Sequence, residues 1–481
     1  MLNAAEYRQL PGEEAAAEVF EDGTPESVEV TGRWQILPMR QKVLVYFQFG
    51  LLGAGVLLPF NALITPSEYF RACFASTKYA NNFASWIVVG YNATTIVFSA
   101  HATATLEKTT PQARITRSGL CILGSLLAFT LSTFIVTQAN SGTAQLYFAF
   151  VILLSIFMAA ATAYFQNATV ALSARFGPLC MGSMLSFQGV VGALISLVQL
   201  IAALSFVKVQ SISTTETVPI DAETIKSATA FFTFTTVLMA IVLTSFRILT
   251  RTRLYAEVAT KDAAAMQEAA IGASRPISSL ERLVSVQRKI SSLCFSIASV
   301  FGITLCLFPA LTSRVTSSSA KPGTSLASPL IFSAVHFLVF NTLDVVGRTI
   351  PSLVPPKLIL ERGWIFILSA LTRIAFVPLF KLGHLQTTHA PPAEPSDSLD
   401  LLLSRAKNDS VSILQADWVF FLLLSLFAIS NGYLSTSLFL AAPNHPQLRV
   451  DERQPAATIL SFWLTIGLAI GSALSFTTSN W

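Results

Sequence analysis

Four polar side chains interrupt one apolar stretch of the chain, residues 329–350: His336, Asn341, Asp344 and Arg348. A charged side chain at the centre of a bilayer costs about 2.5–3.5 kcal/mol, so it needs a cavity or a partner. Asn341, Asp344 and Arg348 are spaced i, i+3 and i+7, which places them on one helical face and lets the two charges pair. This stripe could bind one edge of a polar solute. The carboxylate would accept hydrogen bonds from the hydroxyls of the solute, and the guanidinium would donate hydrogen bonds to it. A structural ion pair is the alternative.

A second polar position is Gln166, which interrupts another long apolar run together with Asn167. Its amide offers one acceptor and two donors, which suits the edge of a nucleobase or an amide solute. A hydrogen bond between helices would explain it equally well. Elsewhere, Pro59 removes a backbone hydrogen bond and predicts a helix kink of the kind found beside transporter cavities. We expect Arg373, in a later apolar stretch, to form a buried structural pair, and a gating element is the alternative.

The composition indicates which elements position these residues. Of the 481 residues, 53% are hydrophobic and 12% are charged, which is about half the charge of a typical soluble domain. Lipid is the solvent that such a composition fits, so we expect an all-α polytopic membrane protein. Counting about 20 apolar residues per span predicts about eleven transmembrane helices. They are expected at 43–64, 82–104, 118–138, 144–172, 181–206, 229–249, 290–311, 329–350, 363–383, 416–441 and 456–477.

Charge divides and orients the chain. The Lys- and Arg-rich connection 250–289 separates a six-helix bundle, 43–249, from a five-helix bundle, 290–481, and an acidic tail occupies 1–42. With the N-terminus inside, the inner loops receive roughly twenty Lys and Arg and the outer loops roughly nine. The positive-inside rule therefore predicts a cytoplasmic N-terminus and an extracellular or lumenal C-terminus. Asn408 is then the sequon that lies outside, and it predicts a glycoprotein.

Several functions lack any supporting pattern. The five cysteines show no CxxC or Cys/His spacing, so we expect no metal and no cofactor. No phosphate-binding loop and no catalytic motif stands in a credible context, so neither an ATPase motor nor catalytic residues are expected. The cations lie in short loops and not in a groove with interleaved aromatic residues, which argues against a nucleic-acid polymer as partner. Transport would therefore follow a gradient.

The polar positions lie within segments that resemble the motifs of the equilibrative nucleoside transporters. The similar segments follow one another in order from about residue 43 to residue 477, which leaves out only the acidic tail. The resemblance implies a fold like that of the major facilitator superfamily, with six plus five helices around a central cavity. It also implies sodium-independent, facilitated movement of nucleosides, often with nucleobases. The segments are 57–65, 181–192, 340–348, 373–380, 430–434 and 467–471.

The resemblance also implies roles for individual residues. Gln166 would bind the base edge, and Asp344 with Arg348, on the stripe that includes Asn341, would hold the ribose hydroxyls. The apolar wall near the base would comprise Leu57, Phe60 and Ile64. Phe60 stands where the family commonly has Trp, and so does Val345 beside Asp344. An indole donor is thereby absent, and no preferred nucleoside is assigned.

The expected mechanism is alternating access by a monomer in the lipid bilayer. Arg348 favours the ionised form of Asp344, so we expect uncoupled transport. Proton-coupled nucleoside transport and transport of another small polar solute, such as a sugar or an amino acid, are the alternatives. Residues 6–10 loosely resemble an acidic-leucine sorting signal, so the compartment is either the plasma membrane or a vacuolar or lysosomal membrane.

Overall fold

A computed structural model gives the fold of the chain. It describes residues 38–80, 82–135, 141–210, 222–260, 278–309, 311, 312, 315, 317, 328–353, 363–384 and 416–478. The sorting-signal stretch 6–10, nearly all of the acidic tail and Asn408 lie outside these residues, as does 261–277 of the connection.

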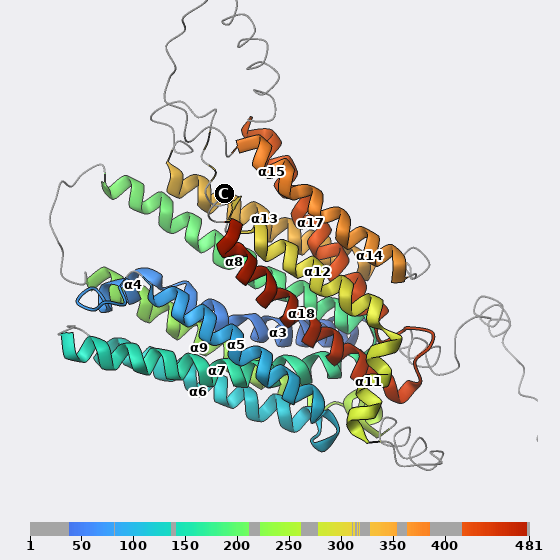
Figure 1. The fold of residues 1–481 in the computed structure, drawn as a ribbon. Helices are drawn as coiled ribbons and strands as arrows, with labels where there is room; N and C mark the ends of the chain where they lie inside the picture. Colours follow the sequence, from blue (N-terminus) through green and yellow to red (C-terminus); the bar gives the residue numbers. More distant parts are fainter. Residues whose placement is uncertain are drawn as a thin grey trace, which may run out of the picture.

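All regular structure in the described residues is helical (Figure 1). The first group comprises α3 (Met39–Ile64), α4 (Ser67–Cys73), α5 (Phe83–Ala104), η1 (Leu106–Lys108), α6 (Pro111–Ile135), α7 (Ser141–Phe176), α8 (Pro178–Gln210) and α9 (Ala222–Thr250). The second comprises α11 (Ser279–Lys289), α12 (Ser291–Leu307), α13 (Pro329–Leu353), α14 (Gly363–Thr372), η5 (Arg373–Ala375), α15 (Phe376–His384), α17 (Asp417–Ala441), η7 (Val450–Glu452) and α18 (Arg453–Thr478).

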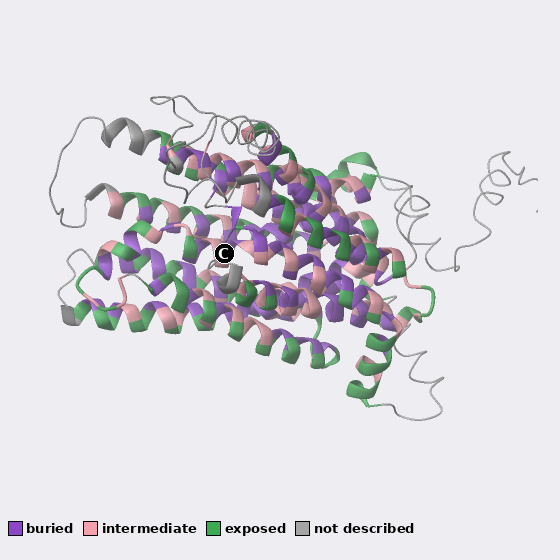
Figure 2. Ribbon diagram, turned by 45° about the horizontal axis from the view of Figure 1, so that its top comes forward, coloured by how far each residue is buried: buried purple, intermediate pink, exposed green. Residues whose placement is uncertain are grey.

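The predicted number of membrane spans is confirmed. Within the described residues, 10 helical segments are long and apolar enough to cross a membrane, and the bent pair α11–α12 brings the number to 11. Exposed residues lie along the outward sides of the helices (Figure 2). Many of the exposed residues are large and apolar; Ile135 and Leu146, for example, are 80% and 75% exposed. Such a surface suits lipid and would aggregate in water. The inside and outside positions of the termini stay a prediction.

Two predicted spans differ from a straight helix. The segment predicted at 290–311 corresponds to α12, which meets the preceding amphipathic helix α11 at Ile290 with a bend of 75°. α11 is a separate helix that begins with its own capping box, Ser278 with Glu281. The segment predicted at 363–383 is interrupted by the 3-10 turn η5 at Arg373–Ala375. Pro378 cannot donate a hydrogen bond to the Ile374 carbonyl, which favours a break at this point. By contrast, α3 continues as a helix through Pro59.

Glycines bring the helices that carry the polar stripe into close contact. A Cβ atom added to Gly432 of α17 would overlap the Asp344 carbonyl oxygen, and one added to Gly347 of α13 would overlap the Ile429 carbonyl. On the opposite side of α13, a Cβ at Gly189 of α8 would lie 2.8 Å from Val345 Cγ2. Consequently α13 lies between α8 and α17, with backbone against backbone on the α17 side.

The first helix group meets the second along two seams. One is the contact of α8 with α13, and the other is the contact of α18 with α5 and α7 (Figure 1). A buried apolar cluster spans both groups, from Phe49 and Phe165 to Ile297 and Leu460. A second cluster, which includes Phe332, lies within the later helices.

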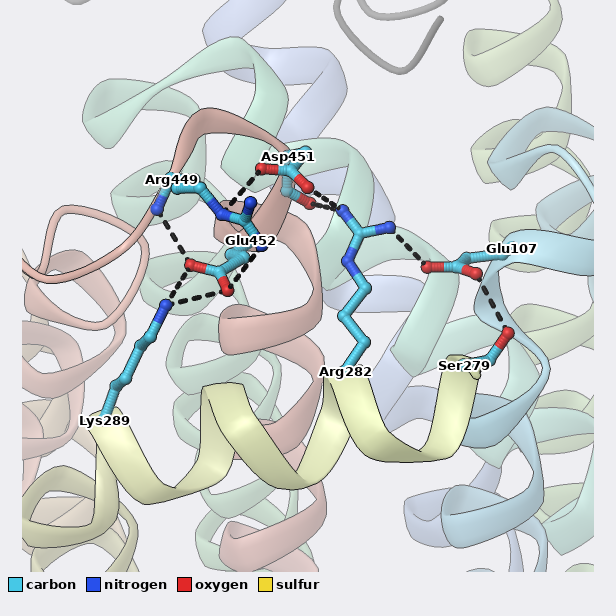
Figure 3. A network of polar contacts seen from close by, with 7 residues as sticks. All are labelled: Glu107, Ser279, Arg282, Lys289, Arg449, Asp451 and Glu452. Atoms are coloured by element: carbon cyan, nitrogen blue, oxygen red, sulfur yellow. Dashed lines mark hydrogen bonds and ion pairs between the residues drawn. The ribbon is translucent and has the colours of Figure 1, made fainter. Parts of the chain in front are cut away.

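At one end of the bundle, α11 is attached to both helix groups (Figure 3). Arg282 Nη1 lies 2.9 Å from Glu107 Oε1 of η1, and its other terminal nitrogen contacts the carboxylate of Asp451 of η7. Lys289 Nζ lies 2.6 Å from Oε2 of Glu452, whose side chain is buried. We call this set, Glu107, Arg282, Lys289, Asp451 and Glu452, the α11 ion-pair network. It fastens the α5–α6 connection to the start of α18.

Candidate functional site

Asp344 and Arg348 form the ion pair that their spacing predicts. Arg348 Nε donates to Asp344 Oδ2 at 2.6 Å, and both side chains are almost fully buried. The second carboxylate oxygen, Oδ1, accepts from Asn431 Nδ2 at 2.7 Å. Because Asn431 belongs to α17, the carboxylate is fixed from two helices. A buried charge pair of this kind is stabilised by its additional hydrogen bonds.

The network continues beyond Asp344 to Arg373. Thr304 Oγ1 of α12 donates to Asn431 Oδ1 at 2.8 Å, and Arg373 Nη2 donates to Thr304 Oγ1 at 2.8 Å. Arg373 Nη1 also donates to the Phe427 carbonyl at 3.0 Å, and the guanidinium carbon lies 4.4 Å from the centre of the Phe427 ring. The polar residues of α12, α13, α17 and η5 therefore form one connected cluster.

Arg373 is buried, and neutral groups hold its guanidinium. Among the described residues, no carboxylate contacts the Arg373 guanidinium, which is held by a carbonyl, hydroxyls and an aromatic face. Hydrogen bonds between described residues connect it to Asp344 through Thr304 and Asn431. Sequence reasoning did not assign these two linking residues. Asn431 lies in segment 430–434, which does resemble the family and offered the available signal.

Asn341 and Asp344 have different hydrogen-bond partners. Its Nδ2 donates to Ser196 Oγ of α8 at 2.7 Å and to the Phe337 carbonyl at 3.0 Å. The side chain is half-buried and helps to join α8 to α13. Of the predicted stripe, Asp344 and Arg348 are therefore brought together, and Asn341 contacts the α8 seam.

Gln166 lies on the other seam. Its Nε2 donates to Ser461 Oγ of α18 at 3.0 Å, so it joins the first helix group to the second. The side chain is half-buried, and its carbonyl oxygen accepts no hydrogen bond from the described residues. The adjacent Asn167 is buried and donates to Thr103 of α5 at 2.9 Å. No contact within the described part of the chain links Gln166 to Asp344.

The predicted apolar wall lies on α3. The Phe60 ring is half-buried and lies 5.1 Å from the ring of Tyr91 on α5. Leu57 is half-buried, and its carbonyl accepts from Asn61 Nδ2 at 2.9 Å. Ile64, one turn beyond Phe60, is 39% exposed. All three side chains thus retain accessible surface inside or beside the bundle, whereas their neighbours Leu58 and Leu63 are buried.

Solved structures with similar folds define the class of protein. The chain superposes on the major facilitator superfamily proton:xylose symporter XylE, bound to 6-bromo-6-deoxy-D-glucose, with a TM-score of 0.56 and 12% identity. That match covers 91% of this chain and 87% of the other. The Escherichia coli fucose:proton symporter FucP gives a TM-score of 0.52 at 13% identity, with 92% of each chain covered. The protein is a helical membrane protein with the major facilitator fold.

Residues 151–479 match the nucleoside transporter family. The chain belongs to that family. Mouse equilibrative nucleoside transporter 2 is 34% identical over 194 residues, which are 40% of this chain and 37% of that protein, so this match spans little more than a third of the relative. Rat equilibrative nucleoside transporter 3 is 24% identical over 89% of this chain and 87% of its own. Nucleoside transporter FUN26 of Saccharomyces cerevisiae is 24% identical over 92% and 85%.

Proposed function

We propose that the protein is a facilitative carrier of nucleosides, with nucleobases as further substrates, and that it converts no substrate chemically. The observation that carries this proposal is the family match over residues 151–479 on a major facilitator fold. It is supported by relatives named as nucleoside transporters that align over most of this chain. Transport would follow the substrate gradient without ATP.

In this proposal Asp344 and Arg348 hold the ribose. Each carboxylate oxygen accepts up to two hydrogen bonds, and each Asp344 oxygen already accepts one, from Arg348 or from Asn431. The remaining lone pairs are available for ribose hydroxyls. Because its present donors keep the carboxylate fixed, little reorganisation is needed when the substrate binds. Asn341 contributes by setting the position of α13 against α8.

Gln166 binds the base edge, and Leu57, Phe60 and Ile64 form the apolar wall beside it. The free carbonyl oxygen of Gln166 can accept from a base N–H, and its amide can exchange Ser461 for a base acceptor. Such an exchange would couple substrate binding to the seam between α7 and α18. Phe60 offers a ring face for stacking and no hydrogen-bond donor.

Alternating access requires the two helix groups to move relative to each other. We propose that 43–249 and 290–481 are the moving bodies and that α13 and α8 remain packed near the substrate. Within the α11 ion-pair network, Asp451 and Glu452 hold α11 to the second body. The contact of Arg282 with Glu107 and the bond from Gln166 to Ser461 are the parts that connect this assembly to the first body. They would have to break when the α11 end opens, so they stabilise the state in which that end is closed.

Competition uptake tests the proposed substrate class. The full chain would be reconstituted in vesicles, and entry of labelled uridine measured with excess adenosine or excess glucose outside. We expect adenosine to abolish tracer entry and glucose to leave it unchanged. The reverse result would assign another polar solute to the same fold. We propose a monomer in the plasma membrane or in a vacuolar or lysosomal membrane, which imaging of the tagged chain would distinguish.

A further inference from the structure

A groove opens on the outer face of the first helix group, away from the proposed nucleoside site. Its volume is about 570 Å³, and it lies between the end of α5, the start of α6 and the later part of α7. One end is lined by the cations Lys108, Arg114 and Arg117, and the other by apolar side chains such as Phe157. Neither an aspartate nor a glutamate is among the lining residues.

The positive charge at this end is not neutralised within the described part of the chain. Arg114 is buried, and it donates to the Ala102 carbonyl at 2.6 Å and to Thr109 Oγ1 at 2.6 Å, with no carboxylate among its contacts. Lys108 and Arg117 are exposed and form no ion pair with the described residues. The neighbouring Glu107 does not line the groove, and its carboxylate contacts Arg282 and Ser279 of α11. The groove therefore favours an anion.

The apolar part of the groove is continuous with the lipid-facing surface. On α7, Leu153, Phe157 and Tyr164 are spaced i, i+4 and i+11, so they share one helical face. Leu153 and Phe157 are 68% and 51% exposed. A ligand that fills both parts needs an anionic head and an apolar chain, and free phosphate would fill only one.

The position along the helices agrees with this chemistry. The cations lie where α5 ends and α6 begins, on the same side of the bundle as α11 (Figure 1). The ends of membrane-spanning helices lie at the level of the phospholipid headgroups. Basic pockets between spans on the cytoplasmic side bind anionic headgroups. The positive-inside prediction places this end in the cytoplasm.

We propose that this groove binds an anionic phospholipid of the surrounding leaflet. Lys108 and Arg117 contact the headgroup, Arg114 strengthens the positive potential from its buried position, and an acyl chain lies along Phe157 and Leu153. Bound lipid would bridge α5, α6 and α7 and so stabilise the first helix group.

Thermal unfolding of the full chain in detergent micelles tests the proposal. The additives are dioctanoyl phosphatidylserine, dioctanoyl phosphatidylcholine and glycerophosphoserine, which has the anionic headgroup without chains. We expect a saturable rise in the unfolding midpoint with phosphatidylserine alone. An equal response to phosphatidylcholine would overturn the requirement for an anion, and saturation by glycerophosphoserine at the same concentration would overturn the lipid assignment.

Variants locate the response. Lys108→Gln with Arg117→Gln should raise the half-saturating phosphatidylserine concentration by on the order of tenfold. Arg251→Gln with Arg253→Gln removes two exposed cations at the end of α9 and should leave it unchanged. Phe157→Asp, at an exposed position, should abolish saturation by opposing the acyl chain. An unchanged response in both groove variants would contradict the proposal.

Discussion

Asn431 Nδ2 donates to Asp344 Oδ1 at 2.7 Å, which joins α17 to the charged stripe of α13. Together with the Arg348 bond to Oδ2, this contact fixes the carboxylate from two directions. It also connects Asp344 through Thr304 to Arg373, so two buried guanidiniums share the field of one carboxylate. Removal of Asp344 should therefore affect more than a single ion pair.

Asp344→Asn is expected to lower the initial rate of uridine uptake by at least about tenfold, because a hydrogen bond to a charged group contributes about 1.5–3 kcal/mol. The measurement is uptake per reconstituted molecule, with the unfolding midpoint recorded beside it. Glu68→Gln, which changes an exposed carboxylate on α4, is the control and should retain the parent rate. Full uptake by Asp344→Asn would remove Asp344 from the site.

Asn431→Ala should lower the free energy of unfolding by about 1–3 kcal/mol, because it removes the hydrogen-bond donor of the buried Asp344 Oδ1. Unfolding by sodium dodecyl sulfate in mixed micelles measures this difference. Asn444→Ala, at an exposed position in the turn that follows α17, should change the stability by less than about 0.5 kcal/mol. Equal losses in the two variants would show that the Asn431 bridge is not what stabilises the cluster.

Gln166→Ala separates substrate binding from helix contact when it is compared with Ser461→Ala. Both variants remove the 3.0 Å bond between α7 and α18. If Gln166 contacts the base, its loss should raise KM for uridine by about three- to tenfold, since a neutral hydrogen bond contributes about 0.5–1.5 kcal/mol. Ser461→Ala should leave KM within about twofold. Matching effects in both would assign Gln166 to the helix contact alone.

Arg282→Gln should favour opening at the α11 end, because it removes the contacts with Glu107 and Asp451 together. Spin labels at the exposed positions Gln112 and Gln447 would report the separation of the two helix groups by electron resonance. We expect the longer-distance population to increase. Arg288→Gln, on the same helix and exposed, is the control. An unchanged distance distribution in Arg282→Gln would show that the α11 ion-pair network does not hold the two helix groups together.

The spacing of residues along the sequence predicted the features that lie within a single helix. The pairing of Asp344 with Arg348 follows from i, i+4 geometry, and the spans follow from runs of apolar residues. The count of apolar residues does not predict the interruption at Arg373, which Pro378 favours, or the polar helix α11 that begins at the Ser278–Glu281 cap and meets α12 at Ile290.

Partners from distant segments could not be read from periodicity. Asn431 is 87 residues from Asp344, and Ser461 is 295 residues from Gln166, so only the packing of whole helices brings them together. The partners of Arg373, a carbonyl and an aromatic ring 54 residues along the chain, could not be predicted for the same reason. Small residues at Gly347 and Gly432 permit this packing, and their role appears only when both helices are in place.

Equilibrium uptake tests the transport proposal most directly. Vesicles that contain the full chain would receive labelled uridine, with and without an imposed pH gradient, and the internal concentration would be followed to its plateau. We expect uptake above that of empty vesicles and a plateau equal to the external concentration in both conditions, since Arg348 keeps Asp344 paired. A plateau above the external concentration under the pH gradient would show proton coupling, and uptake no faster than in empty vesicles would contradict nucleoside transport itself.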